Sequence, residues 1–393
     1  MRRLLDFSLA SSTLLVLFLL APNPARAQIT AHIAVPAGSA ADQALNDIGA
    51  ATDPAQKLAL IDKFAANFGT GQMAALADEL YVDYWVAQKD NAKIYQYGEK
   101  VLADDPANFN VAVTLTRTAS DAGDADRMYG YAEKAGAILQ QYENAPAPTG
   151  TDPAVWAATR QQALAGDQDS ISYVEYTFFS TAYKVADPAQ KAALMLRYAA
   201  AFPDSQYASQ AELITPLAYQ QAKDFPKMIA AANAILAREP NNVDVLLLLA
   251  DYYSENGQHL DLAEADAKQA LAALAAAKKP DAMSDDDWQK QVTLQTGLAW
   301  TSLGQVYITQ KIEAKALTAF QTAAPLLKGN PNIYARNQYR LGFALINLKH
   351  NADAYQAFSD AASVDSPYRA LAQAKLAELQ KAGVGPHAAK KAQ

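Results

Sequence analysis

An internal duplication is the sequence feature that most restricts the fold of this chain. Residues 53–68, DPAQKLALIDKFAANF, recur 134 residues later as residues 187–202, DPAQKAALMLRYAAAF. The same offset aligns Pro106 with Pro240 and Tyr173 with Tyr307. Because this offset is close to four units of about 34 residues, a length typical of stacked helix-turn-helix repeats, the duplication predicts an array of helix pairs.

The composition favours an all-α protein and excludes several classes of site. Alanine dominates over the β-branched residues that favour strands, so an all-β or doubly wound α/β fold is not expected. The net charge of -8 and the lack of a dense Lys/Arg stripe argue against a nucleic-acid partner. The absence of cysteine excludes disulfides, cysteine-zinc sites, thiol catalysis and a lipidated cysteine.

Two successive units show how such helix pairs are expected to pack. Small residues allow the two helices of a unit to approach closely, and large residues fill the space between them and the next unit. The clearest unit, residues 297–328, carries Trp300, Leu303, Gly304, Tyr307, Ala316, Phe320 and Ala323 at these positions. The next unit, from about residue 335, carries Leu341, Gly342, Leu345, Ala354, Phe358 and Ala361.

These residues resemble the tetratricopeptide repeat (TPR) family. The resemblance implies an all-α, right-handed superhelical solenoid of antiparallel helix pairs. More degenerate units keep the register, at residues 75–108, 109–142 and 209–242 and from 243 onward, so we expect the solenoid to cover residues 42–382 in duplicated blocks from about 53 and 187. Residues 28–41 are expected to form a flexible leader and residues 383–393 a flexible tail.

Residues 1–27, MRRLLDFSLASSTLLVLFLLAPNPARA, have the three parts of a secretory signal peptide. They contain a basic start, an apolar stretch from Leu14 to Ala21, and the small-x-small site Ala25-Arg26-Ala27. We therefore expect cleavage before Gln28 and an exported protein, periplasmic or secreted, that is not a lipoprotein. The alternative is an uncleaved membrane anchor, although the apolar core is short for a span. No later segment is apolar enough to cross a membrane.

The sequence contains no recognisable catalytic or metal-binding pattern. The histidines are scattered and none has a partner at metal-ligand spacing; they are His32, His259, His350 and His387. The acidic run at residues 285–287 is interpreted as a helix cap, and SDAGDAD at residues 120–126 as an inter-helix turn. Phosphate-binding glycine loops and the Gly-x-Ser-x-Gly elbow are missing. We therefore expect no enzyme activity, no metal and no cofactor.

A concave groove is where a partner is expected to bind. In the TPR family the first helix of each unit lines the groove, with exposed side chains near relative positions 2, 5, 6, 9 and 12. This rule selects Arg336, Tyr339, Arg340, Phe343 and Ile346, together with Leu298, Thr301, Ser302, Gln305 and Ile308 of the preceding unit. Two guanidinium groups beside aromatic rings could bind a carboxylate or an acidic, partly apolar peptide segment.

Arg336 and Arg340 have a spacing similar to the basic pair with which some family members clamp a partner's C-terminal carboxylate. The resemblance stops there, because Ser302 stands where an asparagine is expected, and Leu247 and Asp251 stand where a Lys/Asn pair is expected. The alternative interpretation is that the two arginines are solvated or pair with nearby acids.

The sequence as a whole favours a non-catalytic scaffold of the cell envelope that binds a protein or peptide partner. Residues 202–225, FPDSQYASQAELITPLAYQQAKDF, resemble repeat units of exported bacterial TPR proteins that serve outer-membrane assembly or envelope constriction. One alternative is a structural subunit of an outer-membrane or secretion assembly complex. A third possibility is a carbohydrate-binding module, or an enzyme, that uses aromatic residues of the groove.

Overall fold

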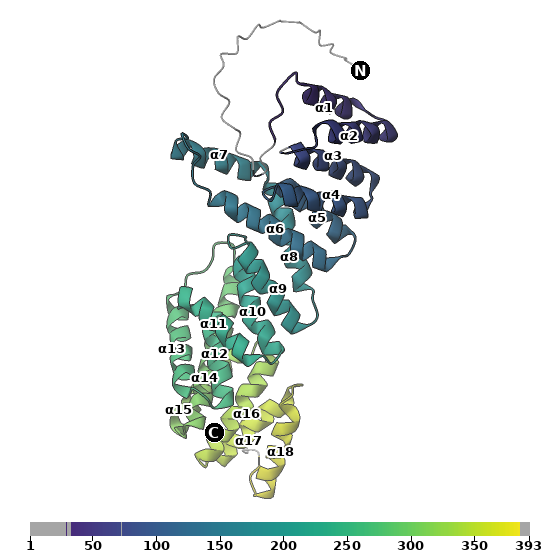
Figure 1. Ribbon diagram of the computed structural model, residues 1–393. Coiled ribbons are helices and arrows are strands. Elements are labelled where there is room, and N and C mark those ends of the chain that lie inside the picture. The colour runs from purple at the N-terminus through teal and green to yellow at the C-terminus, as the bar shows by residue number, and fades with distance from the viewer. Residues whose placement is uncertain (1–28, 30–32, 72, 386–393) are drawn as a thin grey trace, which may run out of the picture. The chain divides into compact units, whose positions relative to one another are not determined.

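The computed structural model describes residue 29, residues 33–71 and residues 73–385. Within these residues the chain forms eighteen α-helices and no strand (Figure 1). The prediction of an all-α fold built from repeated helix pairs is confirmed. The expected signal peptide, residues 386–393 of the expected tail, and two histidines, His32 and His387, lie outside the described residues.

The chain divides into two compact units at Phe178 and Phe179, within helix α8. Unit 1 contains α1 (Ala40–Ala50), α2 (Pro54–Phe68), α3 (Met73–Gln88), α4 (Asn91–Asp104), α5 (Phe109–Asp121), α6 (Ala125–Glu143), α7 (Pro153–Gly166) and the first part of α8 (Gln168–Tyr183). Unit 2 continues with α9 (Pro188–Ala201), α10 (Ala208–Gln221), α11 (Phe225–Arg238), α12 (Val243–Asn256), α13 (Leu260–Ala276), α14 (Asp285–Thr309), α15 (Glu313–Leu327), α16 (Pro331–Asn347), α17 (Asn351–Ser363) and α18 (Arg369–Lys381).

Successive helices make the main packing contacts in both units. In unit 1, α3 packs on α4 and α5 on α6; in unit 2, α12 packs on α13, α14 on α15 and α16 on α17 (Figure 1). Unit 2 has a continuous apolar core that extends from Ala192 to Leu379. Each pair therefore buries its apolar face against its neighbours, as expected of a repeat array.

Aspartate caps mark the helix starts, and their positions follow the duplication. Asp53 and Asp187 precede α2 and α9, and each accepts a hydrogen bond from the backbone N–H three residues later. Asp90 and Asp224 do the same for α4 and α11. These carboxylates satisfy amides that have no partner within the helix and complement the helix dipole.

Two glycines show why the repeat needs small residues at fixed positions. A Cβ atom at Gly304 would lie 2.5 Å from the ring of Phe320, and one at Gly342 would lie 2.6 Å from the ring of Phe358. Both phenylalanines are fully buried, as are Ala316, Ala323, Ala354 and Ala361. Leu303, Tyr307, Leu341 and Leu345 are also buried, and Trp300 is partly buried against the same core.

No helix in the described ranges combines the length and the apolar character that crossing a bilayer would require.

Candidate functional site

Unit 2 contains an apolar groove of about 580 Å³, which we call the leucine groove. Its volume is within the range of ordinary ligand sites. It is formed by α10, α12 and α14, with one residue from α16. The lining residues are Leu213, Pro216, Leu217, Gln220, Asp244, Val245, Leu247, Leu248, Asp251, Gln291, Leu294, Gln295, Leu298, Ser302 and Arg336.

Helical periodicity explains how α12 presents its part of this lining. Asp244, Leu247, Leu248 and Asp251 are spaced i, i+3, i+4 and i+7, so they share one face of the helix. Leucines of α10 and α14 lie opposite. One of them, Leu217, is 45% exposed. The groove therefore offers apolar surface that the rest of unit 2 leaves uncovered.

The polar residues of the leucine groove have an excess of negative charge. Asp244 Oδ1 accepts a hydrogen bond of 2.8 Å from Gln295 Nε2. Asp251 pairs with Arg336, whose Nη1 lies 3.0 Å from Oδ1. The lining thus holds two carboxylates and one guanidinium, and that guanidinium is already paired.

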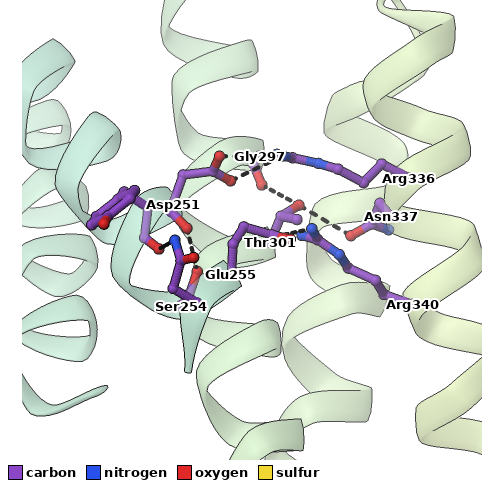
Figure 2. Close-up of polar contacts among 10 residues, drawn as sticks. Asp251, Ser254, Glu255, Gly297, Thr301, Arg336, Asn337 and Arg340 are labelled. Carbon is purple, nitrogen blue, oxygen red and sulfur yellow. Dashed lines mark hydrogen bonds and ion pairs between the residues drawn. The ribbon is translucent and has the colours of Figure 1, made fainter. Parts of the chain in front are cut away.

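Two ion pairs join α16 to α12, as Figure 2 shows. Arg336 pairs with Asp251, and Arg340 pairs with Glu255 one turn further along both helices. The partners are 85 residues apart in sequence, and the helix pair α14–α15 lies between them in the chain. Burial lowers the pKa of the Arg340 guanidinium, and the nearby carboxylate of Asp251 opposes this effect.

Between these ion pairs, Thr301 of α14 and Asn337 of α16 form a buried polar contact (Figure 2). The Thr301 hydroxyl lies 3.0 Å from the carbonyl oxygen of Gly297 and 3.1 Å from Asn337 Oδ1. Asn337 Nδ2 donates to the carbonyl oxygen of Phe320. Every member of this contact has a hydrogen-bond partner, so it fixes α16 against α14 and α15.

Exposure was predicted for Thr301, Ser302 and Arg340, and for these residues the prediction is wrong. Thr301 and Ser302 are covered where α14 contacts its neighbours, and only 7% of Arg340 is exposed. The interpretation of Arg336 and Arg340 as partners of nearby acids is the one that the structure shows.

Tyr339 and Phe343 face away from the leucine groove. Their rings lie 5.7 and 5.5 Å from the ring of Phe358 on α17, and Tyr339 also lies 5.6 Å from Tyr368, which precedes α18. Gln305 is half-buried on α14 and does not line the groove. Of the residues that the positional rule selected, Leu298, Ser302 and Arg336 line the groove.

The leucines that α10 and α12 contribute to the groove were not predicted from the sequence. Leu213, Leu217, Leu247 and Leu248 occupy relative positions 5 and 9, and 5 and 6, of two degenerate units. The positional rule that was applied to the two clearest units would have found them, because it holds for the first helix of every pair.

In the described ranges, no three His, Cys, Asp or Glu side chains are grouped so that they could hold a metal ion. The acidic residues 285–287 lie in the first turn of α14, whose capping side chain is Ser284. Asp124 caps α6 directly after Gly123, which has a left-handed backbone. Residues 122–124 form the turn between α5 and α6, so the interpretation of this segment as an inter-helix turn is confirmed.

No protein-family model matches this sequence, and no curated protein matches it. Three solved structures are similar in fold at low identity. Yeast Tom70 is 11% identical with a TM-score of 0.40, covering 81% of this chain and 66% of its own. A monomeric IFIT1 mutant with m7Gppp-AAAA is 13% identical with a TM-score of 0.35, covering 84% and 71%. Cut9–Hcn1 of the APC/C is 12% identical with a TM-score of 0.29, covering 88% and 90%. These scores carry no conclusion about function.

Proposed function

We propose that this chain is a non-catalytic scaffold that binds a protein partner through an apolar peptide segment in the leucine groove. The observation that carries the proposal is the groove itself, because leucines from α10, α12 and α14 converge there around a volume that a few apolar side chains would fill. Burying one leucine side chain of a partner would contribute about 1.5–3 kcal/mol.

Charge complementarity defines the partner segment further. The groove lining has more carboxylates than cations, and the chain as a whole has a net charge of -8. A segment with a lysine or arginine beside its apolar residues therefore fits this groove better than an acidic one. Arg336 Nε, which is buried without a hydrogen-bond partner within the described residues, supplies one donor for the backbone of the segment.

The experiment uses two labelled synthetic peptides with the same leucine-rich centre, one with lysine at both ends and one with glutamate. The lysine peptide is expected to bind more tightly in fluorescence anisotropy. Leu217→Gln is expected to weaken its binding about tenfold, because one apolar contact is lost. Leu262→Gln is the matched control, since Leu262 is 46% exposed on α13 and outside the groove. Equal loss in both variants, or none in either, would contradict the proposal.

We further propose that this scaffold acts in the cell envelope after export. The support is the signal-peptide pattern of residues 1–27. N-terminal sequencing of the protein recovered from the envelope is expected to begin at Gln28. Recovery of a chain that still begins at Met1 would contradict the cleavage.

A further inference from the structure

Unit 1 contains a pocket of about 750 Å³ whose lining has a net charge opposite in sign to that of the leucine groove. It lies between the end of α3, the start of α4, helix α5 and α8. Its polar lining includes Lys89, Asn91, Thr114, Arg117 and Ser170. We call it the cationic pocket. Its apolar residues are few, and one of them, Val86, is 43% exposed.

The duplication relates the cationic pocket directly to the leucine groove. The pocket residues of α5 share one helix face; they are Asn110, Val113, Thr114, Arg117, Thr118 and Asp121. With the offset of 134 residues they correspond to Asp244, Leu247, Leu248, Asp251, Tyr252 and Glu255 of α12. The two helices therefore present the same face, but an arginine has taken the place of an aspartate, and a threonine the place of a leucine.

The cations of this pocket lack acidic partners. Arg117 lies over the ring of Tyr173, 4.3 Å from its centroid. Throughout the described ranges, no carboxylate forms an ion pair with Arg117 or with Lys89. The corresponding Asp251 of unit 2, by contrast, is neutralised by Arg336. Two unpaired cations and one carboxylate, Asp121, leave the lining with a net positive charge in an acidic protein.

The shape of the pocket indicates an extended ligand. From Asn110 to Asp121 its α5 wall spans about 16 Å at 1.5 Å per residue, which matches about five residues of extended peptide. Hydroxyl and amide groups along the wall, such as those of Thr114, Asn91 and Ser170, can bond a peptide backbone. Two cations are too few for nucleic acid, whose binding proteins neutralise about 6–10 phosphates.

We propose that the cationic pocket is a second binding site, which takes an acidic peptide segment through charge-assisted hydrogen bonds from Arg117 and Lys89 to its carboxylates. This site is distinct from the leucine groove and does not depend on the function proposed for it. The duplicated faces have thus acquired complementary specificities, one for a basic apolar segment and one for an acidic polar segment.

The test measures binding of the full chain to a labelled nine-residue peptide of alternating serine and glutamate, beside the same peptide with glutamine. The glutamate peptide is expected to bind at least tenfold more tightly, and added salt is expected to weaken it. Arg117→Gln is expected to reduce its affinity about tenfold, and Arg117→Lys is expected to retain most of it. Lys134→Gln is the matched control, because Lys134 is exposed on α6 outside the pocket.

Two results would contradict the proposed site, and a third would change the class of its ligand. Equal binding of the glutamate and glutamine peptides, or an unchanged affinity in Arg117→Gln, would overturn the proposal. Tighter binding of trigalacturonate than of the peptide would mean that the ligand of this pocket is an acidic glycan and not an acidic peptide. If Arg117→Gln fails to fold, Lys89→Asn gives the same test, since asparagine tolerates the left-handed backbone at this position. Leu217→Gln must leave this binding intact, which separates it from the leucine groove.

Discussion

Asp266 shows how a single half-buried carboxylate affects the stability of this protein. It lies on α13, and burial raises its pKa to about 6. The unfolded value is near 3.9, so the unfolded chain releases this proton at lower pH than the folded one does. The contribution of Asp266 to stability therefore falls as pH rises from about 4 to 6, and it stays unfavourable above pH 6.

Replacing Asp266 with asparagine removes this penalty. We expect Asp266→Asn to raise the free energy of unfolding by about 1 kcal/mol at pH 7.5, a value reduced for partial exposure to solvent. At pH 4 most of the gain is expected to be lost, because the wild-type carboxyl group is then protonated in the folded state and partly protonated in the unfolded state. Urea unfolding at both pH values measures the effect. Asp261→Asn, in the exposed first turn of α13, should show no such gain, since a carboxylate there complements the helix dipole.

At the scale of the element, the turn between the two helices of a pair has a repeated backbone geometry. A residue with positive φ stands at Lys89, Gly123, Lys223 and Gly257, and again at Lys311 and Lys349. The first four fall into two pairs related by the duplication offset. A left-handed backbone is costly for residues with a side chain, so glycine is the less strained choice at this position.

Two glycines of unit 1 allow the backbone strain of this turn to be compared with the interior of a helix. Gly123 has a φ of 72° in the turn before α6, whereas Gly130 lies inside α6, and neither would bring a Cβ within 4 Å of another group. Gly123→Ala is expected to lower the free energy of unfolding by about 1–2 kcal/mol through backbone strain. Gly130→Ala is expected to raise it by about 0.5–1 kcal/mol. Thermal unfolding measures both, and effects of the same sign would contradict the role of the turn.

Helix pairs could be predicted from the sequence because their contacts are close along the chain. Gly342 and Phe358 are only sixteen positions apart, and the spacing of small and large residues records their contact. The burial of the groove candidates could not be predicted from the sequence in this way. Thr301 is bonded to a residue 36 positions away, and Arg340 to one 85 positions away. Their exposure depends on which helices of distant repeats approach one another, and local periodicity does not contain that information.

At the scale of the whole molecule, the duplication produces the same helix face twice, once on α5 and once on α12. The side chains on these two faces have diverged. In unit 1 the face keeps Arg117 without an acidic partner, whereas in unit 2 Asp251 at the same position is joined to α16. Ion pairs of this kind are unusual in a repeat array, where stability comes mainly from adjacent repeats. The pairs from α12 to α16 add a link that spans the intervening pair α14–α15, so they couple the end of unit 2 to its middle.

The pair of Arg340 with Glu255 tests this coupling. Glu255→Gln leaves the buried guanidinium without its carboxylate, so we expect it to lower the free energy of unfolding by about 2–3 kcal/mol. Arg340→Met removes the buried charge and fills similar space, and is expected to stay close to wild type. Hydrogen exchange should show that Glu255→Gln reduces protection in α16–α18 more than in α9–α11, because the long-range link is lost at that end. Equal destabilisation by both variants, or uniform loss of protection across unit 2, would mean that the ion pair does not couple these repeats.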